Sequence, residues 1–165
     1  MALDTLKRVF IFLALCLAQA LVLGRVQLFH CAMPLLYVYF VIMFPRNYPK
    51  WAILLWSFAM GLTVDLFANT PGVATTSLTL VGAVQPYLLS LFLPRDADDS
   101  TPASAAALGK GKFGTMAALL VLLYCLVFFS LEAFSYFNWQ HFLACAGGSA
   151  VLTLLLILTL ETLRK

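Results

Sequence analysis

The chain has 165 residues, of which 63% are hydrophobic and only 10% are charged, and its mean hydropathy is +0.98. Soluble domains carry about 25% charged residues, so this composition excludes an ordinary water-soluble domain and indicates an integral membrane protein. The formal net charge of +3 is small. No stretch gathers the basic residues into a stripe, which argues against nucleic-acid binding.

The apolar segments predict an all-α polytopic membrane protein with six transmembrane helices. A helix needs about 20 residues to cross about 30 Å of hydrocarbon. In chain order, the predicted helices cover residues 7–24, 28–44, 51–68, 73–93, 113–133 and 139–161. The whole chain, residues 1–165, is therefore expected to form a single six-helix membrane domain. The second helix is the shortest, and Pro34 interrupts it.

The first segment also has features of a cleavable signal peptide. Lys7 and Arg8 precede the apolar run, and Ala18 to Ala20 reads A-Q-A. The apolar run continues through Leu21, however, and cleavage would leave five crossings. We therefore expect this segment to remain in the protein as its first helix.

The third segment carries an acidic residue within a helix that is apolar and long enough to cross a membrane. Ser57, Gly61, Asp65 and Asn69 follow one another at intervals of four residues and so share one helix face. Small and polar residues favour helix–helix contacts in membranes, so we expect this face to point into the bundle. Asp65 is either an ion or proton site, as intramembrane acids often are, or a structural carboxyl. We favour the structural role because the predicted spans offer no second ionisable partner.

A tight turn joins the third and fourth segments. Asn69, Thr70, Pro71 and Gly72 read N-T-P-G, which predicts a turn because Pro71 fixes φ and Gly72 permits a positive φ. The start of the fourth segment is rich in hydroxyl groups. The hydroxyls expected to bind Asp65 are those of Thr75, Thr76, Ser77 and Thr79.

Further polar and small residues lie inside the predicted spans. Gln19 and Gln85 are expected to form hydrogen bonds between helices. Pro86 follows Gly82 by four residues, which predicts a kink in the fourth helix. A small face on the last helix, expected to serve packing, consists of Gly147, Gly148, Ser149 and Ala150.

The only extended polar segment is residues 94–112, which reads PRDADDSTPASAAALGKGK. Its Asp, Ser, Pro, Gly and Ala content predicts a flexible cytoplasmic linker between two halves of three helices. The G-K-G-K sequence lacks the spacing of a phosphate-binding loop. The acidic residues in this segment are expected to be solvated.

The distribution of basic residues predicts the orientation. With six crossings and a cytoplasmic amino terminus, nine of the ten Lys and Arg residues fall on the cytoplasmic side, and only Arg25 falls outside. Positive residues concentrate on the cytoplasmic side of membrane proteins. We therefore expect a multi-pass protein of the bacterial inner membrane with both termini in the cytoplasm.

The sequence offers no reactive or metal-binding constellation. The four cysteines, Cys16, Cys31, Cys125 and Cys145, lie in or beside apolar runs without metal spacing, so small packing residues are expected. A disulfide between Cys31 and Cys145 is left open. No nucleophile has a matched base, and no His pair has zinc spacing. The sequence therefore predicts no enzymatic activity, no metal and no cofactor.

Several stretches together resemble the bacterial rod shape-determining MreD family. Pro34 to Phe40 reads P-L-L-Y-V-Y-F, and Gly61 to Gly72 reads G-L-T-V-D-L-F-A-N-T-P-G, whose D-x-F-x-N-T-P-G part is similar to the Bacteroidetes form. The resemblance extends to the pair Phe44-Pro45, to Gln85-Pro86, to Leu131-Glu132-x-Phe134 and to the end of the last helix. It implies a six-helix fold similar to that of the substrate-binding subunits of energy-coupling-factor transporters.

The resemblance also implies a non-enzymatic subunit of the cell-elongation machinery that supports peptidoglycan synthesis and cell shape. Its direct partner would be MreC, bound through a membrane or juxtamembrane helix at the lateral surface or in a cleft near the third and fourth helices. Indirect partners would be MreB, RodA and a class B penicillin-binding transpeptidase, with membrane lipid around the bundle. The structural or partner-binding candidates are Ser57, Gly61, Asp65, Asn69, Thr70, Pro71, Gly72, Gln85 and Pro86.

Two other functions remain open from the sequence. One is a small-molecule or vitamin-binding subunit of a membrane transporter, which requires an outward-facing pocket with convergent polar groups. The other is a proton-coupled channel that depends on Asp65.

Overall fold

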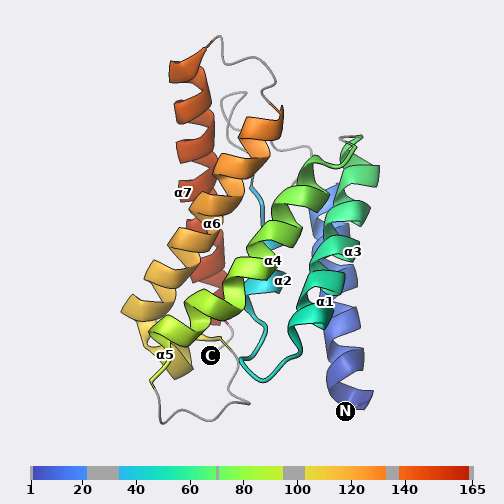
Figure 1. The fold of residues 1–165 in the computed structure, drawn as a ribbon, viewed down its shortest axis with the longest axis vertical. Coiled ribbons are helices and arrows are strands. Elements are labelled where there is room, and N and C mark those ends of the chain that lie inside the picture. Colours follow the sequence, from blue (N-terminus) through green and yellow to red (C-terminus); the bar gives the residue numbers. More distant parts are fainter. Residues whose placement is uncertain (1, 22–33, 70, 95–102, 133–137, 164–165) are drawn as a thin grey trace.

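The computed structural model describes residues 2–21, 34–69, 71–94, 103–132 and 138–163, and all regular structure in these residues is helical. The helices are α1 (Ala2–Leu21), α2 (Val38–Ile42), α3 (Lys50–Ala68), α4 (Val73–Phe92), α5 (Ala105–Leu108), α6 (Lys110–Glu132) and α7 (Trp139–Leu163). The five long helices form a bundle in which α1 begins and α7 finishes at the same end (Figure 1). The expected all-α architecture is confirmed.

Among the described residues, three helices, α3, α6 and α7, are long and apolar enough to cross a membrane. Their length and composition indicate a membrane protein. Helices α1 and α4 run beside them and are 20 residues long each. They are more polar, because α1 carries Asp4, Lys7 and Arg8, and α4 carries hydroxyl residues and Gln85. A count of six crossings remains a prediction.

Of the six predicted helices, the second differs most from the structure. Residues 28–33 lie outside the described residues, and within 34–44 only the five residues of α2 are helical. Prolines bracket this segment at Pro34 and Pro45, and a proline disfavours helical backbone in the residue before it. The segment runs through the middle of the bundle rather than along its surface (Figure 1). Its buried residues are Leu35, Tyr37, Val38, Tyr39, Phe40, Val41, Ile42 and Phe44.

We call residues 34–44 the interior segment. Non-helical backbone at membrane depth is tolerated only where protein or water, rather than lipid, surrounds it. The interior segment meets this condition because α1, α3, α4 and α6 pack against α2. The hydrophobic core of the molecule is built around it.

The predicted flexible linker is also partly helical. Ser104 caps α5 by accepting the Ala107 N–H at 3.3 Å, and Ala103 and Leu108 are buried. Helix α5 packs on α6, which begins at Lys110 rather than at residue 113. An alanine-rich stretch behind a serine cap is a favourable helix start, so this part of the segment is ordered structure.

All Lys and Arg residues among the described ones lie at the end of the bundle where α1 begins. We call this the basic end, and its members are Lys7, Arg8, Arg46, Lys50, Lys110 and Lys112. The opposite end carries the α3–α4 turn, Glu132 and Trp139.

Candidate functional site

Asp65 holds the start of the following helix. Its Oδ1 accepts the backbone N–H of Ala74 at 2.9 Å, and its Oδ2 accepts the backbone N–H of Thr75 at 2.8 Å. Oδ2 also accepts the hydroxyl of Thr75 at 2.6 Å. The residue at the N-cap position of α4, Gly72, makes no side-chain cap. Asp65 therefore caps α4 from the preceding helix, where the helix dipole also favours a negative charge.

The same face of α3 packs directly on α4. A Cβ atom added at Gly61 would lie 2.5 Å from the Thr75 Cα and 2.9 Å from the Ala74 carbonyl oxygen. One turn away from Asp65, glycine is thus required for the backbones to approach. Further along, the side chain of Ser57 occupies the space that a Cβ atom at Gly82 would need. The expected inward orientation of Ser57, Gly61 and Asp65 agrees with these contacts, and all three residues are buried.

The turn that brings α3 and α4 together has the backbone expected of N-T-P-G. Asn69 ends α3 in the left-handed region with φ 56° and ψ 36°, and its N–H bonds to the Asp65 carbonyl. Gly72 has φ 84°. Asn69, Pro71 and Gly72 are exposed, and Thr70 lies outside the described residues. The fourth member of the α3 stripe, Asn69, therefore belongs to the turn rather than to the helix interface.

The other hydroxyls expected to serve Asp65 bond elsewhere. Thr76 donates to the Gly72 carbonyl, Ser77 to the Val73 carbonyl and Thr79 to the Thr75 carbonyl, at 2.6 to 2.7 Å. Each bond lies within its own helix, four residues back. Of the four hydroxyls expected to bind Asp65, that of Thr75 is therefore the one that does so.

Gln85 binds the interior segment. Its Nε2 donates to the Phe44 carbonyl at 3.0 Å and to the Ile42 carbonyl at 3.4 Å. The side chain is fully buried. These carbonyls lie where α2 ends and Pro45 follows, so Gln85 supplies donors that the helix cannot. Pro86 continues α4 beside it, and because proline has no N–H, it donates nothing to the Gly82 carbonyl.

Two further helices bind the backbone of the interior segment near its start. Gln19 of α1 donates from Nε2 to the Pro34 carbonyl at 3.0 Å. Thr153 of α7 accepts the Leu35 N–H at 3.1 Å and donates to the Ser149 carbonyl at 2.7 Å. Side chains of α1, α4 and α7 therefore satisfy backbone groups that would otherwise be buried without partners.

The interior segment also carries two tyrosines that bind other helices. The Tyr37 hydroxyl hydrogen-bonds to the Tyr124 hydroxyl of α6, and the two rings meet edge to face with centroids 5.7 Å apart. Tyr39 donates its hydroxyl to Glu161 Oε2 of α7 at 2.6 Å.

Glu161 is a second buried carboxylate, which sequence reasoning did not select. Besides Tyr39, it accepts the backbone N–H of Ala105 through Oε1 at 2.8 Å. Ala105 is the first residue of α5, so Glu161 holds a helix start near the basic end as Asp65 does at the opposite end. A signal for it exists in the sequence. The buried residues of α7 include Cys145, Ser149, Thr153, Ile157 and Glu161, which follow one another at intervals of four.

The cysteines fall into two groups. Cys16 and Cys125 are buried free thiols, as expected of packing residues. Cys145, near the start of α7, is disulfide-bonded and thus is more than a packing residue. Cys31 lies outside the described residues.

As a whole, the arrangement is a set of hydrogen bonds that join parts of the same chain. Within the described part of the chain, Asp65 and Glu161 bind helix starts, and Gln85, Thr153 and Glu161 bind the interior segment. No group of three or more His, Cys, Asp or Glu residues suited to a metal ion occurs in that part. Comparisons with protein-family models, with curated proteins and with solved structures found no match for this chain.

Proposed function

We propose that this chain is a non-enzymatic subunit of the bacterial cell-elongation machinery, of the MreD type, and that it binds MreC in the inner membrane. The observation that carries the proposal is the motif from Gly61 to Gly72, the most specific part of the resemblance. Its residues work together as one unit: Gly61 permits the close approach of α3 and α4, Asp65 caps α4, and Gly72 forms the turn. MreB, RodA and a class B penicillin-binding transpeptidase would act with it through MreC.

The role of Asp65 favours a scaffold over a proton-coupled channel. An acid that carries protons or ions has to exchange its partners during each cycle. From the described residues, Asp65 accepts three hydrogen bonds, two of them from backbone N–H groups at the start of α4. Releasing them would expose unsatisfied donors at that helix end, which costs about 1–3 kcal/mol for each buried group.

The packing of α3 on α4 bears on where a partner helix would bind. The backbones approach closely at Gly61, and the Ser57 side chain fills the space beside Gly82. This closed contact favours the lateral surface of the bundle over a cleft between the two helices. Association there would depend on close packing and interhelical hydrogen bonds, because lipid removes the ordinary hydrophobic drive between helices.

The proposed orientation places the basic end in the cytoplasm, because Lys and Arg concentrate on that side. Helix α5 and Glu161 would then lie near the cytoplasmic surface, and the α3–α4 turn near the periplasm. In this orientation the α3–α4 turn is available to the periplasmic, juxtamembrane part of MreC.

Co-purification tests the proposal directly. The tagged chain and MreC are produced together, extracted in a mild detergent and captured through the tag, with an unrelated single-span protein as the control. Recovery of MreC in a fixed ratio, without the control protein, is the expected result. Absence of MreC while both proteins remain folded in the extract would contradict the proposal. Retention of a vitamin-sized ligand in native mass spectrometry would instead favour a transport subunit.

A further inference from the structure

Two cations at the basic end are held against aromatic rings. The guanidinium carbon of Arg8 lies 4.4 Å from the ring centroid of Tyr48 and 5.1 Å from that of Phe44. The ammonium nitrogen of Lys50 lies 4.5 Å from the ring centroid of Tyr87. All three distances are within the range of cation–π attraction. The Arg8 contacts join α1 to the residues that precede α3, and the Lys50 contact joins the start of α3 to α4.

The two rings beside Arg8, those of Tyr48 and Phe44, are themselves fixed in place. Trp56 of α3 donates its indole N–H to the Tyr48 hydroxyl at 3.2 Å, and the Tyr48 ring lies 5.0 Å from the Phe44 ring. Phe44 is buried. The surface that positions Arg8 is therefore part of the folded core, rather than a chance contact between mobile side chains.

An aromatic ring orients a cation without cancelling its charge. Among the described residues, neither Arg8 nor Lys50 forms an ion pair with a carboxylate. The acids of the described chain at this end are Asp4, on the first turn of α1, and the buried Glu161, which binds Tyr39 and Ala105. The two cations therefore keep their positive charge for an external anion.

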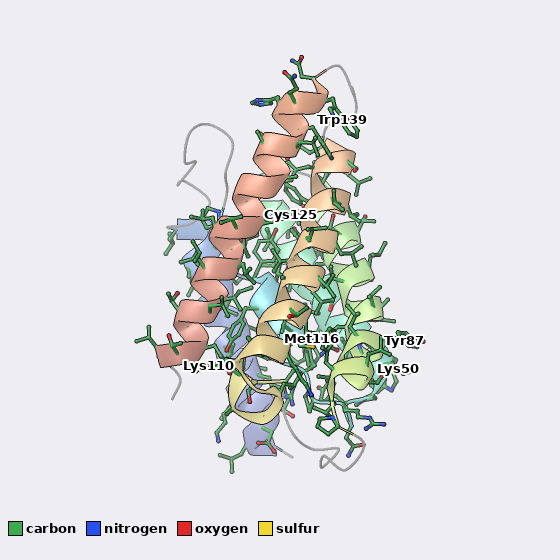
Figure 2. The ribbon with its side chains drawn as sticks, turned by 90° about the vertical axis from the view of Figure 1, so that its left-hand side faces the viewer. Lys50, Tyr87, Lys110, Met116, Cys125 and Trp139 are labelled. Atoms are coloured by element: carbon green, nitrogen blue, oxygen red, sulfur yellow. The ribbon has the colours of Figure 1, made fainter. Side chains whose placement is uncertain are left out.

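Aromatic residues beside these cations indicate how deep in the membrane the cations lie. Trp51 follows Lys50 and is 70% exposed, and Tyr87 is 61% exposed. Exposed Trp and Tyr residues on a membrane protein concentrate at the headgroup level. Figure 2 shows Lys50 and Tyr87 together near the basic end, with Lys110 on the other side of the same end.

We propose that Arg8, positioned by Tyr48, and Lys50, positioned by Tyr87, bind the phosphates of anionic phospholipids in the adjacent leaflet. A guanidinium with its face on a ring keeps its N–H edge for a phosphate, which it binds with two parallel hydrogen bonds. The Lys50 ammonium adds a second donor group. This inference rests on the chain being a membrane protein and is independent of the proposed cell-elongation role.

Lipid binding to matched variants tests the site. The purified protein is reconstituted in nanodiscs of phosphatidylcholine with increasing phosphatidylglycerol, and bound lipid and thermal stability are both measured. Juxtamembrane cations contribute about fivefold each to anionic-lipid binding. The double variant R8Q/K50Q should lose roughly tenfold or more of the preference for phosphatidylglycerol. The control K110Q/K112Q removes the same charge from two lysines of α6 at the same end. It should retain most of the preference for phosphatidylglycerol.

Three outcomes would overturn the proposal. An equal loss in both double variants would show that only overall surface charge matters, and an unchanged preference in R8Q/K50Q would show that the site does not bind. A stabilisation by inorganic phosphate as large as that by phosphatidylglycerol would show that no lipid is required.

Variants of Tyr87 distinguish the loss of lipid binding from a defect in folding. Tyr87→Phe keeps the aromatic face and should bind phosphatidylglycerol as the parent does, whereas Tyr87→Leu should bind it more weakly. Stability in pure phosphatidylcholine measures the fold of each variant without the anionic lipid. Equal binding by the Phe and Leu variants would contradict the role of the ring.

Discussion

The carboxylate of Asp65 and the residue Thr75 are joined twice, because one oxygen accepts both the backbone N–H at 2.8 Å and the hydroxyl at 2.6 Å. With the Ala74 N–H on the other oxygen, a residue near the end of α3 satisfies two of the free donors in the first turn of α4. We expect Asp65→Leu to destabilise the protein by about 2–5 kcal/mol, since it leaves buried donors without acceptors. Asp65→Asn keeps one acceptor oxygen and should cost less. Unfolding of the purified variants in SDS–detergent mixtures measures both.

Removing the hydroxyl of Thr75 tests its bond to Asp65, and removing the hydroxyl of Thr76 is the control. Thr75→Val removes the hydroxyl bond to Asp65 and should destabilise the protein by about 1 kcal/mol. Thr76→Val removes a bond that lies within α4 on an exposed residue and should have almost no effect. If Asp65→Leu and Asp65→Asn unfolded alike, or if Thr76→Val were the more damaging hydroxyl variant, the capping role of Asp65 would be wrong.

Glycine substitutions test the contact between α3 and α4. Gly61→Ala places a Cβ atom 2.5 Å from the Thr75 Cα, and backbone atoms cannot give way as a flexible side chain can. We expect a loss of about 1–3 kcal/mol or more from this overpacking. Gly147→Ala is the matched control on α7, because its Cβ would meet no atom within 4 Å. Thermal unfolding should separate the two variants, and equal stability would contradict the close approach at Gly61.

The α3–α4 hairpin could be predicted from the sequence because its signals are local. Ser57, Gly61 and Asp65 repeat at the spacing of one helix face, and the turn follows directly. The buried residues of α7 repeat at the same spacing, Thr153 and Glu161 among them. Glu161 was nevertheless not predicted as a buried tie, since an acid in the last turn of a helix, close to the basic chain end, usually faces solvent.

The interior segment could not be predicted in the same way. An apolar run such as residues 35–44 reads alike whether lipid or protein surrounds it, because composition reports hydrophobicity and not the neighbour. The deciding contacts come from far along the chain, as with Leu35 and Thr153, or Tyr39 and Glu161. Residues 28–33 lie outside the described residues, so that part of the second predicted helix stays a prediction.

Removing the Glu161 carboxylate should release α5. Glu161→Leu removes the acceptor of both the Ala105 N–H and the Tyr39 hydroxyl, and among the described residues the Ser104 cap then remains at the start of α5. We expect faster tryptic cleavage after Lys110, which is exposed next to α5. Glu161→Gln keeps one acceptor oxygen and should lie between the parent and Glu161→Leu.

Thr162→Ala is the control for α5 release, because Thr162 is exposed on the same turn and bonds only within α7. Its cleavage rate should equal that of the parent. Unchanged cleavage in Glu161→Leu, measured in protein whose helical content is unaltered, would show that α5 is held by other contacts.

The disulfide at Cys145 gives a prediction about orientation. Disulfides persist in oxidising compartments and are rare in the cytosol, and Cys145 lies near the start of α7, away from the basic end. The proposed orientation places this region on the periplasmic side. When the chain is denatured without reductant, we expect two reactive thiols, those of Cys16 and Cys125. After reduction, all four cysteines of the chain should react.

Mass spectrometry after alkylation counts these thiols on the intact chain. Cys145→Ser should expose one additional thiol without reductant, because the former partner of Cys145 becomes free. Cys125→Ser, as the control, should lower the count by one both before and after reduction, since its thiol is free in the parent. Four reactive thiols in unreduced protein isolated from the bacterial inner membrane would place Cys145 on the reducing side. That result would reverse the assignment of the basic end to the cytoplasm, and with it the exposure of the α3–α4 turn to a periplasmic partner.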